Sequence, residues 1–244
     1  MRRVCVVTGA AGKLGSRICE RLSADYNILG VYHQNLPSQF DSQLVQSFDP
    51  LTRETVQCKS LSLPYLIKAD LKKADDQKRI VEVCLARFGK IDLLVNAAAD
   101  IRFYGELKYT WSHLASVQDQ LFLNAIAPVL LASSFVDYFW KKSAEQNRQF
   151  NRNIINVSSV SGLNVYPGFG QGFYSASKAA LNYLTCHLAS EYENIAIRAN
   201  AICPVDFPGT IATEAVVDEI VRLDSSKESG KVFLLDEGGS RATN

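Results

Sequence analysis

The sequence predicts an α/β fold in which helices cover both faces of a parallel sheet. Short runs rich in β-branched residues alternate with longer stretches of helical periodicity along the chain. A glycine-rich turn also joins the first such run directly to the first helical stretch, an arrangement typical of βαβ units. Because no internal repeat and no Pro-, Gly- or Ser-rich linker divides the 244 residues, we expect residues 1–244 to form a single domain.

The expected elements follow one another in the order strand, helix, strand. Each strand is a short aliphatic run, and the strands in chain order are Arg3–Thr8, Asn27–Tyr32, Tyr65–Ala69, Ile91–Asn96, Asn153–Val157, Ile195–Ala201 and Val232–Leu235. The expected helices are Lys13–Ala24, Asp75–Phe88, Val117–Lys142, Phe173–Tyr192 and Glu214–Leu223. Gly89 stops the second of these, because glycine suits the left-handed position after a helix. Residues 33–63 are expected to form a long irregular connection, and residues 143–152 an exposed polar loop.

Composition argues against several classes of partner. The 26 basic and 25 acidic residues leave a net charge of +1, which gives no steering toward nucleic acid or an anionic membrane. The longest apolar stretch, near Leu121 to Val136, is interrupted by polar residues and Pro128, so we expect no membrane span. The apolar run after Arg3 is too short for a signal peptide. These observations predict a cytoplasmic protein.

The six cysteines predict neither a metal site nor a disulfide framework. They form no Cys-x-x-Cys pair, and none stands at metal-ligand spacing from a histidine. Cys5 and Cys203 fall in apolar runs, and Cys19 and Cys84 fall on helical stretches, where cysteine acts as a small hydrophobic residue. We therefore expect a reducing compartment and no bound metal.

The turn Thr8-Gly9-Ala10-Ala11-Gly12-Lys13-Leu14-Gly15 predicts a phosphate-binding site. Its small residues let the backbone turn tightly and approach a pyrophosphate, and the following helix offers unpaired N–H groups to it. A purely structural turn is the alternative. The second strand ends at Tyr32-His33 without the acid that usually holds the ribose hydroxyls of NAD. Lys13 and His33 would suit a 2′-phosphate, so we expect NADP(H), with NAD(H) possible; a simply solvated Lys13 is the alternative.

A tyrosine and a lysine share one face of the helix that begins near residue 173. Tyr174 and Lys178 are four residues apart, and an ammonium beside a phenol favours the phenolate. Such a pair serves as a general acid and base for an alcohol–carbonyl couple, although the same spacing is frequent in helices without function. Upstream, Ser159 follows an apolar strand and could donate a hydrogen bond to a substrate oxygen. Its neighbour Ser158 is the other candidate, and either hydroxyl could merely cap the strand.

These residues, taken in order, resemble the short-chain dehydrogenase/reductase family. The resemblance rests on Thr8-Gly9 with Gly15, Leu94-Val95-Asn96-Ala97-Ala98, Asn124, Ser159, and Tyr174 with Lys178, and it extends to Ile197–Pro204 and Gly230–Gly239. It implies a single doubly wound Rossmann-like domain with a parallel sheet of about seven strands. The sequence departs from the family pattern at Lys13, at Ala97 and Ala99, and at Val205.

The resemblance also implies roles for individual residues. Tyr174 is the expected proton donor or acceptor, Lys178 lowers its pKa and holds the nicotinamide ribose, Ser159 orients the carbonyl, and Asn124 supports a water that relays protons toward Lys178. The residues expected to contact the cofactor are Thr8, Gly9, Gly12, Lys13, Leu14, Gly15, His33, Asp70, Leu71, Asn96, Ala97, Ala98, Tyr174, Lys178, Pro204 and Val205. Members of the family pair related helices across a two-fold axis, which implies a homodimer or homotetramer.

The expected function is an NADPH-dependent carbonyl reductase or alcohol dehydrogenase. Residues 205–213 are too few to build the helical lid usual in the family, so we expect an open cleft that accepts small-molecule or carrier-bound carbonyl substrates. The loop Ser161–Phe173, which carries Tyr166 and Phe169, is the expected source of substrate contacts, with a plain surface loop as the alternative. Two other functions stay open: a catalytically silent dinucleotide sensor or scaffold, and a lyase, dehydratase or epimerase on the same fold.

Overall fold

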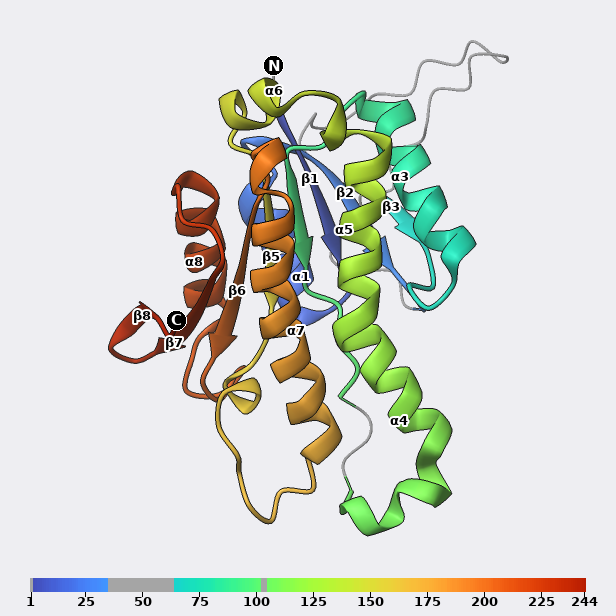
Figure 1. The fold of residues 1–244 in the computed structure, drawn as a ribbon, viewed down its shortest axis with the longest axis vertical. Coiled ribbons are helices and arrows are strands. Elements are labelled where there is room, and N and C mark those ends of the chain that lie inside the picture. Colours follow the sequence, from blue (N-terminus) through green and yellow to red (C-terminus); the bar gives the residue numbers. More distant parts are fainter. Residues whose placement is uncertain (1, 35–63, 102–104) are drawn as a thin grey trace.

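The computed structural model describes residues 2–34, 64–101 and 105–244. Most of the connection expected at residues 33–63 therefore lies outside the described residues. Within the described residues, eight strands form one sheet in the order β3-β2-β1-β4-β5-β6-β7-β8 (Figure 1). The strands are β1 (Arg3–Thr8), β2 (Tyr26–Tyr32), β3 (Tyr65–Lys68), β4 (Leu93–Asn96), β5 (Asn153–Val157), β6 (Arg198–Pro204), β7 (Lys231–Asp236) and β8 (Gly239–Ala242). The first seven are parallel, as expected, and β8 is an antiparallel edge strand that the sequence did not predict.

Helices cover both faces of this sheet. They are α1 (Lys13–Leu22), α3 (Ala74–Phe88), α4 (Leu114–Leu121), α5 (Ala127–Tyr138), α6 (Ala144–Gln149), α7 (Gly172–Glu191) and α8 (Thr213–Ser225). In Figure 1, α3, α5 and α7 stand over one face, and α1 and α8 cover the other. Strand β1 shows why both faces are needed: Val4 and Val6 belong to the core beneath α3, α5 and α7, whereas Cys5 and Val7 belong to the core beneath α1 and α8.

The expected helix Val117–Lys142 is interrupted in the structure. A π-helical turn, Phe122–Ile126, separates α4 from α5, and a 3₁₀ turn at Trp140–Lys142 follows α5. Pro128 contributes to the break, because it has no N–H to donate to the carbonyl of Asn124 four residues earlier. The π turn widens the helix at Asn124.

The prediction of an exposed loop at residues 143–152 is wrong, because that segment contains α6. Ser143 caps the helix by accepting a hydrogen bond from the backbone N–H of Gln146 at 3.2 Å. Asn147 is fully buried and donates to the carbonyls of Trp140 and Ile195, each at 2.7 Å. The Ser-x-x-Gln spacing is a capping signal that the sequence already carried.

Strand β6 begins later than the expected Ile195. A 3₁₀ turn occupies Glu193–Ile195, and Ala196 adopts a left-handed conformation with φ of 57°. Extended backbone therefore starts only at Arg198 and continues to Pro204. The other parallel strands and helices begin or end within a few residues of their expected bounds.

One helical stretch, Leu107–Lys142, is long and apolar enough to cross a membrane by length and composition. Of its most apolar window, 44 % is buried inside the fold, and buried core helices of soluble proteins meet the same criterion. Leu131 and Phe135 on α5 pack in the core, whereas Ile126 and Leu130 are exposed. Within this stretch, α5 packs one face in the core and leaves a second apolar face exposed.

Candidate active site

The structure brings the expected site residues to one edge of the sheet. Because the strands are parallel, their carboxyl ends lie together, and each expected segment follows one of these ends. The segments are Thr8–Gly15 after β1, His33 after β2, Asp70 and Leu71 after β3, Asn96–Ala98 at the end of β4, Ser159 after β5, and Pro204 with Val205 at the end of β6.

The glycine-rich turn fits a pyrophosphate closely packed against backbone. Gly9 has φ of +73°, and a Cβ there would lie 2.9 Å from the Cα of Ala98. A Cβ on Gly15 would lie 2.1 Å from the carbonyl oxygen of Gly9, so only glycine permits this contact. Gly12 is the N-cap of α1 and supplies no side-chain acceptor to the first-turn N–H groups, which a bound anion can therefore take. These residues fit the dinucleotide that the turn predicts.

Thr8 supports this turn from behind. Its side chain is 1 % exposed, and its Oγ1 accepts hydrogen bonds from the backbone N–H groups of Ala97 and Ala98, each at 3.2 Å. The threonine thus ties the end of β1 to the turn after β4, which flanks the same part of the edge. Leu71 is also mostly buried and packs in the core.

At the outer end of the site, two expected cofactor residues lie next to each other. His33 Nε2 is 3.8 Å from Asp70 Oδ2. The Asp70 carboxylate also accepts a hydrogen bond from the N–H of Lys72, and its own N–H donates to Asp76. Lys13 is exposed at the first residue of α1. This end of the edge therefore carries two side chains, His33 and Lys13, that can face a phosphate, together with the carboxylates of Asp70 and Asp76.

Lys178 is the most unusual cation in the fold. It is 2 % exposed, its Nζ donates to the carbonyl of Val157 at 2.9 Å, and it lies 5.9 Å from the centre of the Tyr174 ring. Burial lowers the pKa of its ammonium to about 8, with a smaller opposing effect from the nearby Cys203 thiol. The geometry joins Tyr174 and Lys178 as the sequence predicted, and it anchors the lysine to the end of β5.

The two serines after β5 have different contacts. Ser158 is buried and donates to the carbonyl of Lys178 at 3.2 Å, so it fastens the strand end to α7. Ser159 is partly exposed, and its Oγ accepts a hydrogen bond from the N–H of Ser161 at 3.1 Å. A hydroxyl that accepts in this way still has its own proton to donate. Of the two candidates, Ser159 is therefore the one free to address a substrate oxygen.

Gly162 sets the distance between this serine turn and α7. A Cβ at Gly162 would lie 2.7 Å from the carbonyl carbon of Lys178 and 2.8 Å from the nitrogen of Ala179. The backbone of the turn therefore packs directly on the backbone of α7. This contact brings Ser159 beside the residues of α7.

Asn124 lies in the π turn, and its side chain is held by three hydrogen bonds. Its Nδ2 donates to the carbonyl of Asp100 at 2.8 Å and to Ser177 Oγ at 3.1 Å, and its Oδ1 accepts from the N–H of Asp100 at 2.7 Å. Its backbone carbonyl lacks its α-helical donor, because the residue four positions later is Pro128. The side chain is thus committed, and the backbone carbonyl is the group that can hold a water.

A buried polar chain that the sequence did not predict lies behind the site. Asn96 Nδ2 donates to Asn156 Oδ1 at 2.8 Å, and Asn156 Nδ2 donates to Thr185 Oγ1 at 2.8 Å. All three are essentially buried, and they join β4, β5 and α7. An asparagine inside an otherwise aliphatic strand was the available signal, because such a residue needs a partner when buried.

The loop before α7 contacts the segment that begins at Gly105, a contact that the sequence did not predict. The N–H of Gly105 donates to the carbonyl of Gly170 at 2.6 Å, and a Cβ on Gly172 would lie 2.9 Å from Leu107. Within the loop, the rings of Tyr166 and Phe169 lie edge to face with centres 6.4 Å apart. The segment that begins at residue 105 therefore packs beside the loop that precedes α7.

The connection between β6 and α8 is short and contains no helix. Val205 donates to the carbonyl of Leu235 at 2.9 Å, and Asp206 accepts hydrogen bonds from the N–H and hydroxyl of Thr210. Phe207 packs against the core beneath α1 and α8. The connection therefore forms a turn in which Thr210 is bonded back to Asp206.

Comparisons with known proteins agree with this geometry. The family model described as short chain dehydrogenase matches residues 3–220. The chain is 27 % identical over 237 residues to a diacetyl reductase of Staphylococcus epidermidis, covering 96 % of this chain and 82 % of that protein. It is 29 % identical over 225 residues to an acetoacetyl-CoA reductase of Allochromatium vinosum, covering 90 % and 80 %. A short chain dehydrogenase structure from Mycobacterium avium superposes with a TM-score of 0.78 at 24 % identity, covering 99 % and 84 % of the two chains. The chain belongs to the short-chain dehydrogenase/reductase family of NAD(P)-dependent oxidoreductases.

Proposed function

We propose that this protein is an NADPH-dependent carbonyl reductase, or an alcohol dehydrogenase in the reverse direction, with Tyr174 as its acid and base. The observation that carries this proposal is the position of Lys178. A buried ammonium fixed to the carbonyl of Val157, 5.9 Å from the Tyr174 ring, is placed to favour the phenolate form. A silent dinucleotide sensor has no use for that charge.

The residues of the chain divide the work of the reaction. When bound, the nicotinamide dinucleotide supplies or accepts the hydride. Tyr174 gives its proton to the carbonyl oxygen, and Ser159 donates a hydrogen bond to the same oxygen. Lys178 stabilises the phenolate that Tyr174 leaves behind. Lys178 then returns a proton to this phenolate, and a water held by the backbone carbonyl of Asn124 reprotonates Lys178.

The preference for NADPH is supported by the charge around the outer end of the site. No acid ends β2, and Lys13 is exposed at the start of α1, within the phosphate turn. His33 adds a second side chain that can donate to a 2′-phosphate. The Asp70 carboxylate lies 3.8 Å from His33 Nε2 at this end of the site.

The proposed substrate is a ketone, small or tethered to a carrier, that enters an open cleft. The connection at residues 205–212 contains no lid helix, and the aromatic loop near Tyr166 and Phe169 stands by the Tyr174 end of α7. Relatives named for diacetyl, acetoacetyl-CoA and glucose favour a compact polar carbonyl or alcohol. We therefore place selectivity in this loop.

We also propose that the protein is a cytoplasmic homodimer or homotetramer. Ile126, Leu130 and Tyr138 leave a second apolar face on the π turn and α5, and Tyr183 is 73 % exposed on α7. Pairing of these faces would remove apolar surface from water. Light scattering at micromolar concentration tests this: a stable monomer would contradict it.

The activity is tested by following NADPH absorbance against a panel of carbonyl compounds. The panel contains diketones, β-ketoacyl thioesters and aldoses. Each compound is also assayed with Tyr174→Phe, and the rate of this variant is taken as the background. Consumption that is specific to the wild-type protein with at least one ketone supports the proposal. Tight dinucleotide binding without turnover on any member would instead favour the sensor.

A further inference from the structure

A cavity of about 370 Å³ lies at the edge of the sheet opposite the active site. It is bordered by the first residues of β6 and by the last turns of α7, whereas the site residues stand at the other ends of these elements. Its volume falls within the range of about 300–1,000 Å³ that small-molecule sites occupy. Among the described residues that line it are Arg148, Asn151, Cys186, Glu193, Arg198 and Lys227.

The lining carries an excess of positive charge. Its ionisable cations are Arg148, Arg198 and Lys227, and its one carboxylate is Glu193, so three positive charges face one negative charge. Lys227 Nζ and Arg198 Nε both donate to the same neutral oxygen, Oδ1 of Asn151, each at 3.1 Å. Among the residues that the structure describes, no carboxylate pairs with Arg148 or Lys227.

Arg198, the third cation, donates its hydrogen bonds to neutral oxygens. It is 9 % exposed, and its other N–H groups donate to the carbonyls of Asn151, Leu223, Asp224 and Glu228. Burial lowers the pKa of its guanidinium. These neutral carbonyls satisfy its donors, and the nearby Asp224 and Glu228 carboxylates favour its charge.

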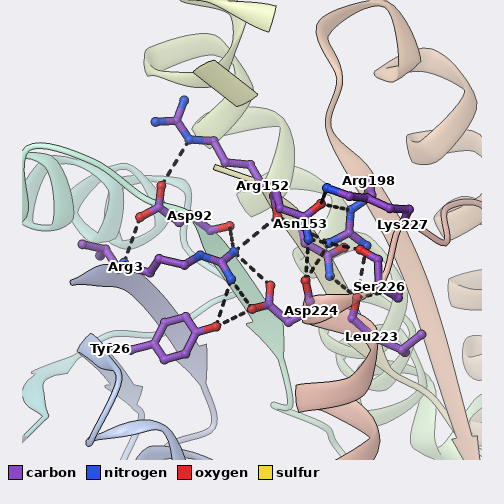
Figure 2. Close-up of polar contacts among 12 residues, drawn as sticks. Arg3, Tyr26, Asp92, Arg152, Asn153, Arg198, Leu223, Asp224, Ser226 and Lys227 are labelled. Atoms are coloured by element: carbon purple, nitrogen blue, oxygen red, sulfur yellow. Dashed lines mark hydrogen bonds and ion pairs between the residues drawn. The ribbon is translucent and has the colours of Figure 1, made fainter. Parts of the chain in front are cut away.

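The buried aspartates nearby are already committed to other cations (Figure 2). Asp224 accepts hydrogen bonds from Arg3 and from the hydroxyl of Tyr26, and Asp92 pairs with Arg152 and Lys90. Asp224 also favours the charge of Arg198, so the positive charge that the cavity offers to a ligand comes from Arg148 and Lys227.

We infer that this cavity is a second ligand site and that it binds a small dianion carrying a phosphate group. Three cations and one carboxylate among the lining side chains suit a phosphate monoester or inorganic phosphate, whose charge near neutral pH is about −1.5 to −2. Arg148 can hold it with a planar pair of N–H groups and Lys227 as a point charge. Arg198 is mostly buried and contributes its positive charge from the lining of the cavity. The site is separate from the proposed dinucleotide turn.

Cys186 provides a readout inside this cavity. Its Sγ lies 3.5 Å from the carbonyl of Gly230, and it is partly accessible, whereas Cys5, Cys19, Cys84 and Cys203 are buried. Burial raises the pKa of the Cys186 thiol, so alkylation by iodoacetamide is followed at alkaline pH, where the thiolate forms. Mass spectrometry of the peptide that contains Cys186 isolates its signal from that of Cys58, which lies outside the described residues.

We expect inorganic phosphate to slow alkylation of Cys186 saturably, at ionic strength held constant with chloride. Arg148→Ala/Lys227→Ala should raise the half-protecting concentration about tenfold or more, because charge-assisted hydrogen bonds are lost. The matched control is Lys141→Ala/Lys142→Ala, which removes two exposed cations from the turn before α6, outside the cavity. It should change protection by less than about twofold. Glu193→Gln should strengthen protection.

Three results would overturn the inference: no saturable protection, equal loss in the control pair, or weaker protection in Glu193→Gln. Glycerol phosphate in the same assay distinguishes a phosphate ester from free phosphate as the preferred ligand. Succinate tests for a dicarboxylate, and stronger protection by succinate than by both phosphates would contradict the assigned chemistry. Because Cys186 is remote from Tyr174, these outcomes do not depend on whether the proposed reductase activity is found.

Discussion

The ammonium of Lys178 donates a hydrogen bond to the carbonyl of Val157 at 2.9 Å, and this bond fastens α7 to the end of β5. Ser158 crosses the same junction in the other direction by donating to the carbonyl of Lys178. The two bonds fix a buried charge between the tyrosine on α7 and the serine after β5. The proposed catalytic groups are thereby held by elements that the hydrophobic core already positions.

The charge of Lys178 should set the alkaline limit of carbonyl reduction. Burial disfavours the ammonium, so its pKa is lowered to about 8: below this pH Lys178 is charged, and above it the proton is lost. We expect the rate of reduction to fall as the pH rises through about 8. The pH profile of kcat measures this. Lys178→Arg, which stays charged, should be slower at every pH but lack this decline, and an undiminished wild-type rate up to about pH 10 would contradict the assignment.

Gly162→Ala should damage activity as well as stability. The added Cβ would meet the backbone of Lys178 and Ala179 at under 3 Å, so the serine turn and α7 must move apart. Overpacking of this kind costs about 1–3 kcal/mol, and thermal unfolding should report that loss together with a lower kcat.

The matched control for this variant is Gly89→Ala. Gly89 has φ of +70° and open space around it, and it ends α3 on the far side of the fold. Its substitution should cost about 1–2 kcal/mol of backbone strain and leave kcat unchanged. Loss of kcat in both variants to the same degree would mean that general destabilisation, and not the α7 contact, is responsible.

Lys13→Ala should weaken NADPH binding much more than NADH binding. Loss of a charge-assisted contact to the 2′-phosphate is worth about 1.5–3 kcal/mol, or roughly ten- to a hundredfold in Kd. Fluorescence titration of both reduced cofactors measures the ratio, and Lys13→Arg should preserve it. Equal affinities of the wild-type protein for the two cofactors would refute the preference.

Substrate preference should respond to the loop before α7 more than to the connection after β6. Tyr166→Ala and Phe169→Ala remove the paired rings near the Tyr174 end of α7, and we expect changes in KM and in the ranking of substrates. Phe207→Ala lies in the short connection, where the ring packs on the core, and should do less. A strong shift in specificity with Phe207→Ala, beside silent loop variants, would reverse this assignment.

Most of the fold could be predicted because local patterns and tertiary packing agree along the parallel strands. The exceptions have different causes, and one of them, the cap that Ser143 gives to Gln146, was already visible in the sequence. Helix α6 is fixed by Asn147 reaching the carbonyl of Ile195, and β6 starts late because Ala196 turns left-handed. Strand β8 is exposed along its whole length, so its sequence has no alternation of apolar and polar residues that would predict a strand.

The candidate site was predictable as a set of residues but not as a network. The order of motifs placed Tyr174, Lys178 and Ser159 at one edge, because parallel strands end together. The sequence left Ser158 and Ser159 as alternatives for binding a substrate oxygen. The hydrogen bond from Ser158 to the carbonyl of Lys178 distinguishes them, because it leaves Ser159 as the available hydroxyl. The chain from Asn96 through Asn156 to Thr185 joins three elements, and spacing along the sequence carries no information about it.

The most direct test of the account is turnover by Tyr174→Phe. The substitution removes one hydroxyl from α7, so folding and dinucleotide binding should stay nearly unchanged, as circular dichroism and cofactor fluorescence can verify. General acid catalysis contributes on the order of 10²–10⁴ in rate, and we expect kcat for carbonyl reduction to fall by that factor. Turnover within a few-fold of the wild-type rate would contradict the assignment of Tyr174 as the catalytic acid.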